Sequence, residues 1–163
     1  MKRTLLLICT LLCANVLFAQ SSFVIDSLRY GVISTNPPKV RVTGPYGSIT
    51  TANIPSTVTY QGTTYSVTSI RQYSFENCSS LTSVSIPNSV TSIETRAFKG
   101  CSSLRYVTIG NSITSIGDKA FYGCDILTLN FNAINCSNFS YNVDGNGVAY
   151  HPFAYCFIKT INI

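Results

Sequence analysis

The stretch from Ser79 to Phe121 reads SSLTSVSIPNSVTSIETRAFKGCSSLRYVTIGNSITSIGDKAF, and its second half repeats its first. The repeat step is 23 residues, and the same step continues on both sides of the stretch. It relates four columns of like residues: Cys78, Cys101 and Cys124; Phe75, Phe98 and Phe121; Ile70, Ile93 and Ile116; and Leu81, Leu104 and Leu127. So many positions in register indicate a true internal repeat.

One coil of this length makes a short strand and a return path, and it cannot bury its apolar side alone. Stacking the coils covers that side and places equal positions above one another. The alternation Val84-x-Ile86 predicts a strand, which Pro87-Asn88-Ser89 ends with a turn. Val90-x-x-Ile93 predicts a second inward-facing extended piece. We expect residues 94–100 to form one turn of helix, closed by a left-handed Gly100.

The string from Ile86 to Leu104, Ile-Pro-Asn-Ser-Val-Thr-Ser-Ile-x-x-x-Ala-Phe-x-Gly-Cys-Ser-Ser-Leu, resembles the BspA-like leucine-rich repeats of bacterial surface and secreted proteins. The resemblance covers residues 54–132. It implies a β-rich, right-handed solenoid of 23-residue coils with short parallel strands and short helical turns. The family pattern has no catalytic residues to carry over to this sequence. Some members of the family are adhesins that bind host matrix proteins or other cells.

Residues 1–19 have the pattern of a secretory signal peptide, with cleavage expected between Ala19 and Gln20. Lys2 and Arg3 form the basic start, and an apolar run from Leu5 to Phe18 follows. The mature chain is therefore expected to be secreted or held at the cell surface. Cleavage lowers the formal net charge from +5 to +3, since it removes two cations. No basic run indicates a nucleic-acid partner, and no further stretch is long and apolar enough to span a membrane.

Residues 20–66 are expected to form a β-rich cap, because the first coil would otherwise expose its apolar end to water. Within it, strands are predicted around 23–25, 30–33 and 40–42, and a hairpin is predicted around Gln61-Gly62. Residues 67–132 are assigned to the leucine-rich repeats, and 133–163 to an irregular insertion with a partial terminal repeat.

The terminal repeat is marked by Phe153-Ala154-Tyr155-Cys156, which resembles Phe121-Tyr122-Gly123-Cys124. No polar segment is predicted to cover this last coil. Two alternatives follow. The chain is a truncated copy of a longer repeat protein, or the open end pairs with something, for example end to end with another molecule.

The residues with reactive side chains favour structural roles. The cysteine column could hold a metal or a redox pair, but it has no Cys-x-x-Cys and no nearby histidine. Stacked strands lie about 4.8 Å apart, whereas disulfide Cβ atoms lie about 3.8 Å apart, so a bridge between coils would be strained. His151 has no partner motif, and Asp144-Gly145-Asn146-Gly147 lacks the further acidic ligands of a calcium loop. The sequence therefore predicts no enzyme, no metal site and no cofactor.

The strand positions that alternate with the apolar columns are expected to face solvent. We take them as the candidate partner-binding face: Ser83, Ser85, Arg105, Tyr106, Thr108, Thr128 and Asn130. Polar residues there also keep a sheet soluble, but Tyr and Arg are enriched at protein contacts. The sequence predicts an exported, non-enzymatic binding or adhesion module for a protein or glycan on a host or cell surface. The alternative is a repeat fragment or scaffold with no ligand of its own.

Overall fold

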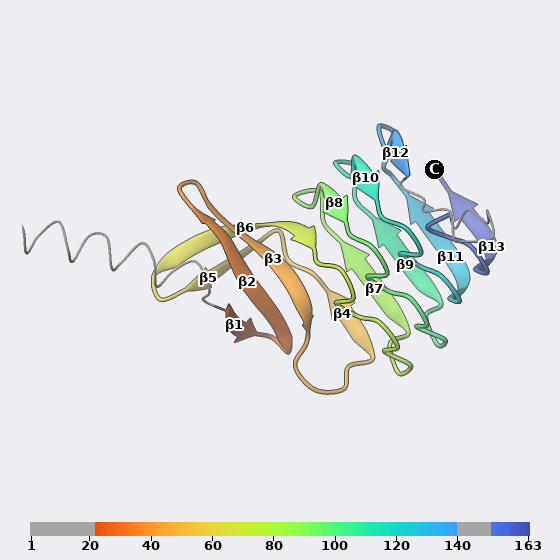
Figure 1. Cartoon of the computed structure of the whole chain (residues 1–163), viewed down its shortest axis with the longest axis horizontal. Coiled ribbons are helices and arrows are strands. Elements are labelled where there is room, and N and C mark those ends of the chain that lie inside the picture. The colour runs from red at the N-terminus through yellow and green to blue at the C-terminus, as the bar shows by residue number, and fades with distance from the viewer. Residues whose placement is uncertain (1–21, 140–150) are drawn as a thin grey trace, which may run out of the picture.

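The chain is a solenoid whose successive coils add a strand to each of two sheets (Figure 1). The computed structural model describes residues 22–139 and 151–163, and within these ranges the chain forms strands and turns but no helix. No helix long and apolar enough to cross a membrane occurs in this part of the chain. The β-rich repeat architecture expected from the sequence is therefore confirmed.

The five-stranded sheet is parallel and has the order β13-β11-β9-β7-β4. Its strands are β4 (Thr51–Asn53), β7 (Ser83–Ile86), β9 (Tyr106–Ile109), β11 (Asp125–Phe131) and β13 (Phe157–Asn162). Val84 lies opposite Val107, at the predicted step of 23, whereas Val107 lies opposite Leu129, at a step of 22. The coils are thus not all of the predicted length.

The short coil changes which residue fills the leucine column. Leu81 and Leu104 are fully buried as expected, but in the next coil the buried residue is Ile126, and Leu127 is half-buried. The Leu127 N–H donates to the carbonyl of Arg105, so Leu127 takes the position after the column. Leu129 and Phe131 pair at a step of 22, which confirms the sequence-based expectation that the strand after Cys124 is one residue short. The prediction that Leu127 continues the column is wrong, because the missing residue lies before the strand and not within it.

The eight-stranded sheet joins the cap to the repeats. It has the order β1-β2-β3-β6-β8-β10-β12, with β5 paired to β6. Its strands are β1 (Ser22–Ile25), β2 (Leu28–Thr35), β3 (Pro38–Pro45), β5 (Thr57–Tyr60), β6 (Thr63–Ile70), β8 (Ser92–Ile93), β10 (Ser115–Ile116) and β12 (Asn138–Phe139). The three predicted cap strands and the β5–β6 hairpin are confirmed, and Gln61 and Gly62 take the positive φ angles that a tight hairpin needs.

The predicted helical turn at 94–100 is wrong. The segment is a series of turns in which Ala97 and Lys99 donate to the carbonyls three residues earlier, at Glu94 and Arg96. The alternate amides leave the coil: the Phe98 N–H donates to Ala120 at 2.7 Å, and the Gly100 N–H to Tyr122 at 2.8 Å. Amides used between coils cannot form a helix. Gly100 does take the predicted left-handed conformation, with φ 72°.

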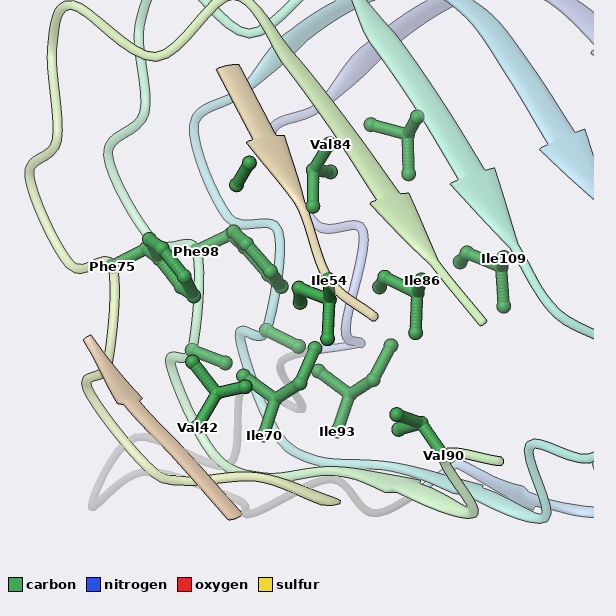
Figure 2. Packing of buried hydrophobic residues seen from close by; sticks show 14 of the residues in the cluster. Val42, Ile54, Ile70, Phe75, Val84, Ile86, Val90, Ile93, Phe98 and Ile109 are labelled. Atoms are coloured by element: carbon green, nitrogen blue, oxygen red, sulfur yellow. The ribbon is translucent and has the colours of Figure 1, made fainter. Parts of the chain in front are cut away.

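The phenylalanine column is the centre of the core and confirms the stacking prediction. Phe75, Phe98 and Phe121 are fully buried, and Figure 2 shows the first two side by side. Their ring centroids are 4.9 and 5.0 Å apart, with planes inclined by 6° and 7°. Phe153 extends the stack at 5.0 Å from Phe121, so the predicted terminal repeat is present.

Candidate partner-binding face

The outward side of the five-stranded sheet carries two columns of hydrogen-bonding side chains. Each column takes one residue from every strand, at positions that alternate with buried Val84, Val107 and Leu129. The first column is Thr51, Ser83, Tyr106, Thr128 and Thr160, and the second is Asn53, Ser85, Thr108, Asn130 and Asn162. Six of the seven residues predicted from the sequence lie in these columns, and the seventh, Arg105, directly precedes β9.

Hydrogen bonds along the second column hold its side chains in place. The Asn162 amide donates to the Asn130 amide oxygen at 2.7 Å, and the Asn130 amide donates to the Thr108 hydroxyl at 3.2 Å. The bonds follow from the parallel register, which places like positions of neighbouring strands side by side. The column therefore presents amide and hydroxyl groups in a fixed row.

Tyr106 is the one large aromatic residue of the two columns, and its side chain is 55% exposed. Arg105, beside it, is bound within the molecule. Its guanidinium donates to the carbonyls of Ser102 and Asp125 at 3.0 and 2.8 Å and lies 3.4 Å from the Asp125 carboxylate. Arg105 thus contributes a largely neutralised group at the border of the face.

Sequence reasoning did not include the outward residues of the two outer strands, β4 and β13, in this face. Thr51 and Asn53 lie on β4, within the range expected for the cap, and pair with Ser83 and Ser85 at a step of 32 residues. The sequence does contain a signal for β4, because Ile54-Pro55 resembles Ile86-Pro87. The two residues before Ile54 pair with the two residues before Ile86. The outward residues of β13 could not be found from the 23-residue step, because Thr160 lies 32 residues after its partner Thr128.

The cysteine column contributes to the packing of the coils, with Cys101 and Cys124 buried and Cys78 partly buried. The Cys101 thiol donates to the Phe75 carbonyl at 3.0 Å, and the Cys124 thiol donates to the Phe98 carbonyl at 3.1 Å. The described cysteines are free thiols. Burial raises the pKa of Cys78 and of Cys156 to about 11, and hydrogen bonding with Cys101 together with burial raises the pKa of Cys124. These thiols are protonated, and hence poor nucleophiles, at neutral pH.

The remaining sequence candidates do not meet at a common site. His151 is exposed, and its Nδ1 atom accepts the Phe153 N–H at 3.3 Å. No cluster of three or more metal-ligating side chains occurs within residues 22–139 and 151–163. Asp144-Gly145-Asn146-Gly147 and the signal peptide at 1–19 lie outside the described residues.

A hollow of about 550 Å³ lies at the side of the coils, and its lining is polar apart from one isoleucine. It is lined by Asn111, Ser112, Thr114, Asn132, Ile134 and Asn135. None of these side chains titrates near neutral pH, so the hollow offers no general acid or base.

The comparisons with known proteins agree with this architecture. The family model described as BspA type leucine rich repeat region, with six copies, matches residues 68–163. A leucine-rich repeat protein from Bacteroides capillosus ATCC 29799, whose structure is solved, is 26% identical with a TM-score of 0.70, over 88% of this chain and 98% of that one. No curated protein matches the chain.

Two longer solved structures are similar over the repeats. A leucine-rich repeat protein from Bacteroides ovatus ATCC 8483 is 28% identical with a TM-score of 0.58, over 71% of this chain and 36% of that one. A leucine rich cell surface protein from Faecalibacterium prausnitzii A2-165 is 27% identical with a TM-score of 0.56, over 72% of this chain and 35% of that one. The chain therefore spans little more than a third of each of these two proteins.

Proposed function

The chain belongs to the BspA-type leucine-rich repeat family, and on that premise we propose that it is a secreted or cell-surface, non-enzymatic binding module that takes a protein or glycan partner. The cell-surface description of the similar Faecalibacterium protein supports this location, as does the signal-peptide pattern of residues 1–19. The partner binds the outward side of the five-stranded sheet, and binding does not change it chemically.

The observation that carries the proposal is the pair of polar columns around Tyr106. Their Ser, Thr and Asn side chains are short and lie on a hydrogen-bonded sheet, so little conformational entropy is lost when a partner orders them. The links from Asn162 to Asn130 and from Asn130 to Thr108 fix the direction of donors and acceptors before binding. Tyr106 supplies the exposed aromatic anchor that binding surfaces commonly use.

The size of the face indicates the kind of partner. Five parallel strands span about 19 Å from β4 to β13, since neighbouring strands lie about 4.8 Å apart. The two columns are separated by about 7 Å along the strands. Such a narrow array suits an extended peptide segment or a short run of sugar units lying across the strands.

The test is a binding screen of the exported chain against host matrix proteins and a glycan array, followed by Tyr106→Ala. Tyr155→Ala is the matched control, because this tyrosine is also exposed but lies outside the columns. We expect a saturable ligand whose binding weakens at least ten-fold in Tyr106→Ala and is unchanged in Tyr155→Ala, with both variants folded. Equal binding by the two variants, or no ligand in the whole screen, would contradict the proposal.

A second candidate, a scaffold that assembles end to end without a ligand of its own, is favoured by β13. Among the described strands β13 pairs with β11 alone, and its side chains Phe157 and Ile161 are exposed. Ile161 lies in register with buried Leu129, so an interior position is uncovered at this edge. Light scattering over a concentration series decides the question: self-association abolished by Ile161→Lys supports the scaffold, and a monomer at all concentrations rejects it.

A further inference from the structure

The cap carries a second face, distinct from the polar columns. Residues 22–71 contain four cations and one acid, which gives this segment a formal charge of 4 − 1 = +3. Arg29 lies on β2, Lys39 and Arg41 on β3, and Arg71 directly after β6. Each cation is next in sequence to a buried residue. Arg29 precedes Tyr30, Lys39 precedes Val40, Arg41 precedes Val42, and Arg71 follows Ile70. All four cations therefore lie on the outward side of the eight-stranded sheet.

The strand register brings these cations together. Arg41 lies opposite Gly31 on one side and Ser69 on the other, and Gly31 is two residues from Arg29. The Arg71 N–H donates to the Val42 carbonyl at 2.9 Å, which places Arg71 beside β3. Neighbouring strands are about 4.8 Å apart, and alternate residues of one strand about 7 Å apart. The four side chains thus form one cluster on β2, β3 and the end of β6, where Figure 1 shows these strands next to one another.

No carboxylate of the described residues forms an ion pair with these four cations. The ion pairs of the described residues join Lys99 to Glu76 and Arg105 to Asp125, and both lie in the repeats. The Glu94 carboxylate accepts the Gln72 N–H at 3.0 Å, which places one negative charge near Arg71 without an ion pair between them. Asp26, the one acid of residues 22–71, is an exposed residue of the turn between β1 and β2 and forms no ion pair with the four cations.

Two details shape the cluster for recognition. The Arg29 guanidinium lies 5.2 Å from the ring centroid of Tyr46, which is well exposed, so a cation and an aromatic face are offered together. Gly31 lies beside two outward residues of β3: a Cβ built there would lie 3.2 Å from the Thr43 Cγ2 atom and 3.9 Å from the Arg41 Cγ atom. The Arg41 Nε atom is shielded from solvent and has no hydrogen-bond acceptor among the described residues. The buried Nε atom keeps the Arg41 stem close to the sheet, and Arg41 as a whole residue is only partly buried.

We propose that this cationic face, formed by Arg29, Lys39, Arg41 and Arg71, binds an acidic polysaccharide with carboxylate or sulfate groups. Three of the four cations are arginines, whose planar guanidinium groups bind such oxyanions through two parallel hydrogen bonds. Ser66 and Ser69 on β6 lie beside Lys39 and Arg41 and offer hydroxyls to the sugar ring.

Other anionic polymers fit the face less well. Single-stranded nucleic acid is bound mainly on several aromatic platforms, one for each base, and here Tyr46 is the aromatic residue next to the cations. Anionic lipid surfaces attract dense runs of lysine and arginine, which this sequence lacks. An acidic sugar chain carries both anionic groups and hydroxyls, and the face offers cations for the first and the Ser66 and Ser69 hydroxyls for the second.

The experiment measures binding of the exported chain to heparin and to polygalacturonate, with neutral dextran, a single-stranded DNA oligonucleotide and anionic lipid vesicles as comparisons. We expect saturable binding to one or both acidic polysaccharides that weakens as salt is added, because the contacts are exposed charge pairs. No binding to either polysaccharide would overturn the proposal, and so would stronger binding to the DNA or to the vesicles.

Matched double variants locate the site. Arg41→Gln with Arg71→Gln removes two charges from the face, and Lys119→Gln with Lys159→Gln removes two charges from the repeats. The first pair should weaken binding about ten-fold, since an exposed charge contact contributes roughly a factor of three, and the second pair should change it less than two-fold. Equal losses would mean attraction to net charge and would reject the site. If the first pair does not fold, Arg29→Gln with Lys39→Gln, both exposed, replaces it with the same expected loss.

The outcome is independent of the proposed function of the polar columns. Tyr106→Ala should leave polysaccharide binding unchanged, because Tyr106 lies on the other sheet. A loss of polysaccharide binding in Tyr106→Ala would place the ligand on the polar columns and overturn the assignment to the cap.

Discussion

Replacing Phe98 by alanine tests the physical basis of the whole solenoid. Phe98 is fully buried between two parallel rings, at 4.9 Å from Phe75 and 5.0 Å from Phe121. A buried Phe→Ala change costs about 3–5 kcal/mol, and each lost ring pair contributes about 0.5–1.5 kcal/mol of stabilisation beyond area burial. The neighbouring coils cannot close the cavity, because the Phe75 and Phe98 amides are hydrogen-bonded between coils at 2.7 Å. We therefore expect a loss near 5 kcal/mol.

The assay is equilibrium unfolding in urea of the wild type and Phe98→Ala, with Phe153→Ala as the matched control. Phe153 is only half-buried and stacks on one described ring, so its loss should cost about 1–2 kcal/mol. The dependence of the unfolding free energy on urea should be the same in the wild type and both variants, since the folded chain is otherwise intact. A loss below about 1 kcal/mol for Phe98→Ala, or equal losses for the two variants, would refute the continuous stacked core.

Three further predictions follow from particular positions. Ile126→Ala should lower the free energy of unfolding by about 2–5 kcal/mol and Leu127→Ala by about 1 kcal/mol or less, the reverse of the order expected from the repeat step; urea unfolding checks it. Gly100→Ala should be more destabilising than Gly123→Ala in thermal melts, because both glycines have positive φ but only a Cβ at Gly100 would contact the side chain of an asparagine in the preceding coil. The raised pKa of Cys78, about 11 against a usual 9, stabilises the folded chain below pH 9, and this contribution should be lost between about pH 9 and 11; Cys78→Ser should flatten that part of the stability curve.

The core was predictable because it is periodic, and the failures occur where the period breaks. The phenylalanine column follows directly from three residues at equal spacing. Ile126 could not be predicted by the same rule, since one residue is missing before β11 and every later position shifts. The place of Thr51 on β4 could not be predicted from the repeat step either, because the hairpin of β5 and β6 adds residues to its coil.

The helical turn at 94–100 failed for a different reason. Its composition fits a single turn of helix, and local sequence cannot show whether an amide donates within its own coil or to the next one. In the structure the Phe98 amide donates to the following coil, and this long-range bond replaces a local one. Arg105 is a similar case at the candidate site. Arginine is common at protein contacts, which suggested a guanidinium available to a partner, but Asp125, 20 residues later, binds this guanidinium within the molecule.

The outward positions are where such a chain is free to acquire binding specificity. In the central coils the inward residues pack against the coils on both sides, as the rings on both sides of Phe98 show. The outward residues touch mainly their own column, so exchanging Ser85 for Thr108 or Asn130 between coils leaves the backbone register intact. Surface substitutions of this kind usually change stability by less than about 0.5 kcal/mol. Ligand preference in this architecture can therefore change one coil at a time while the core stays constant.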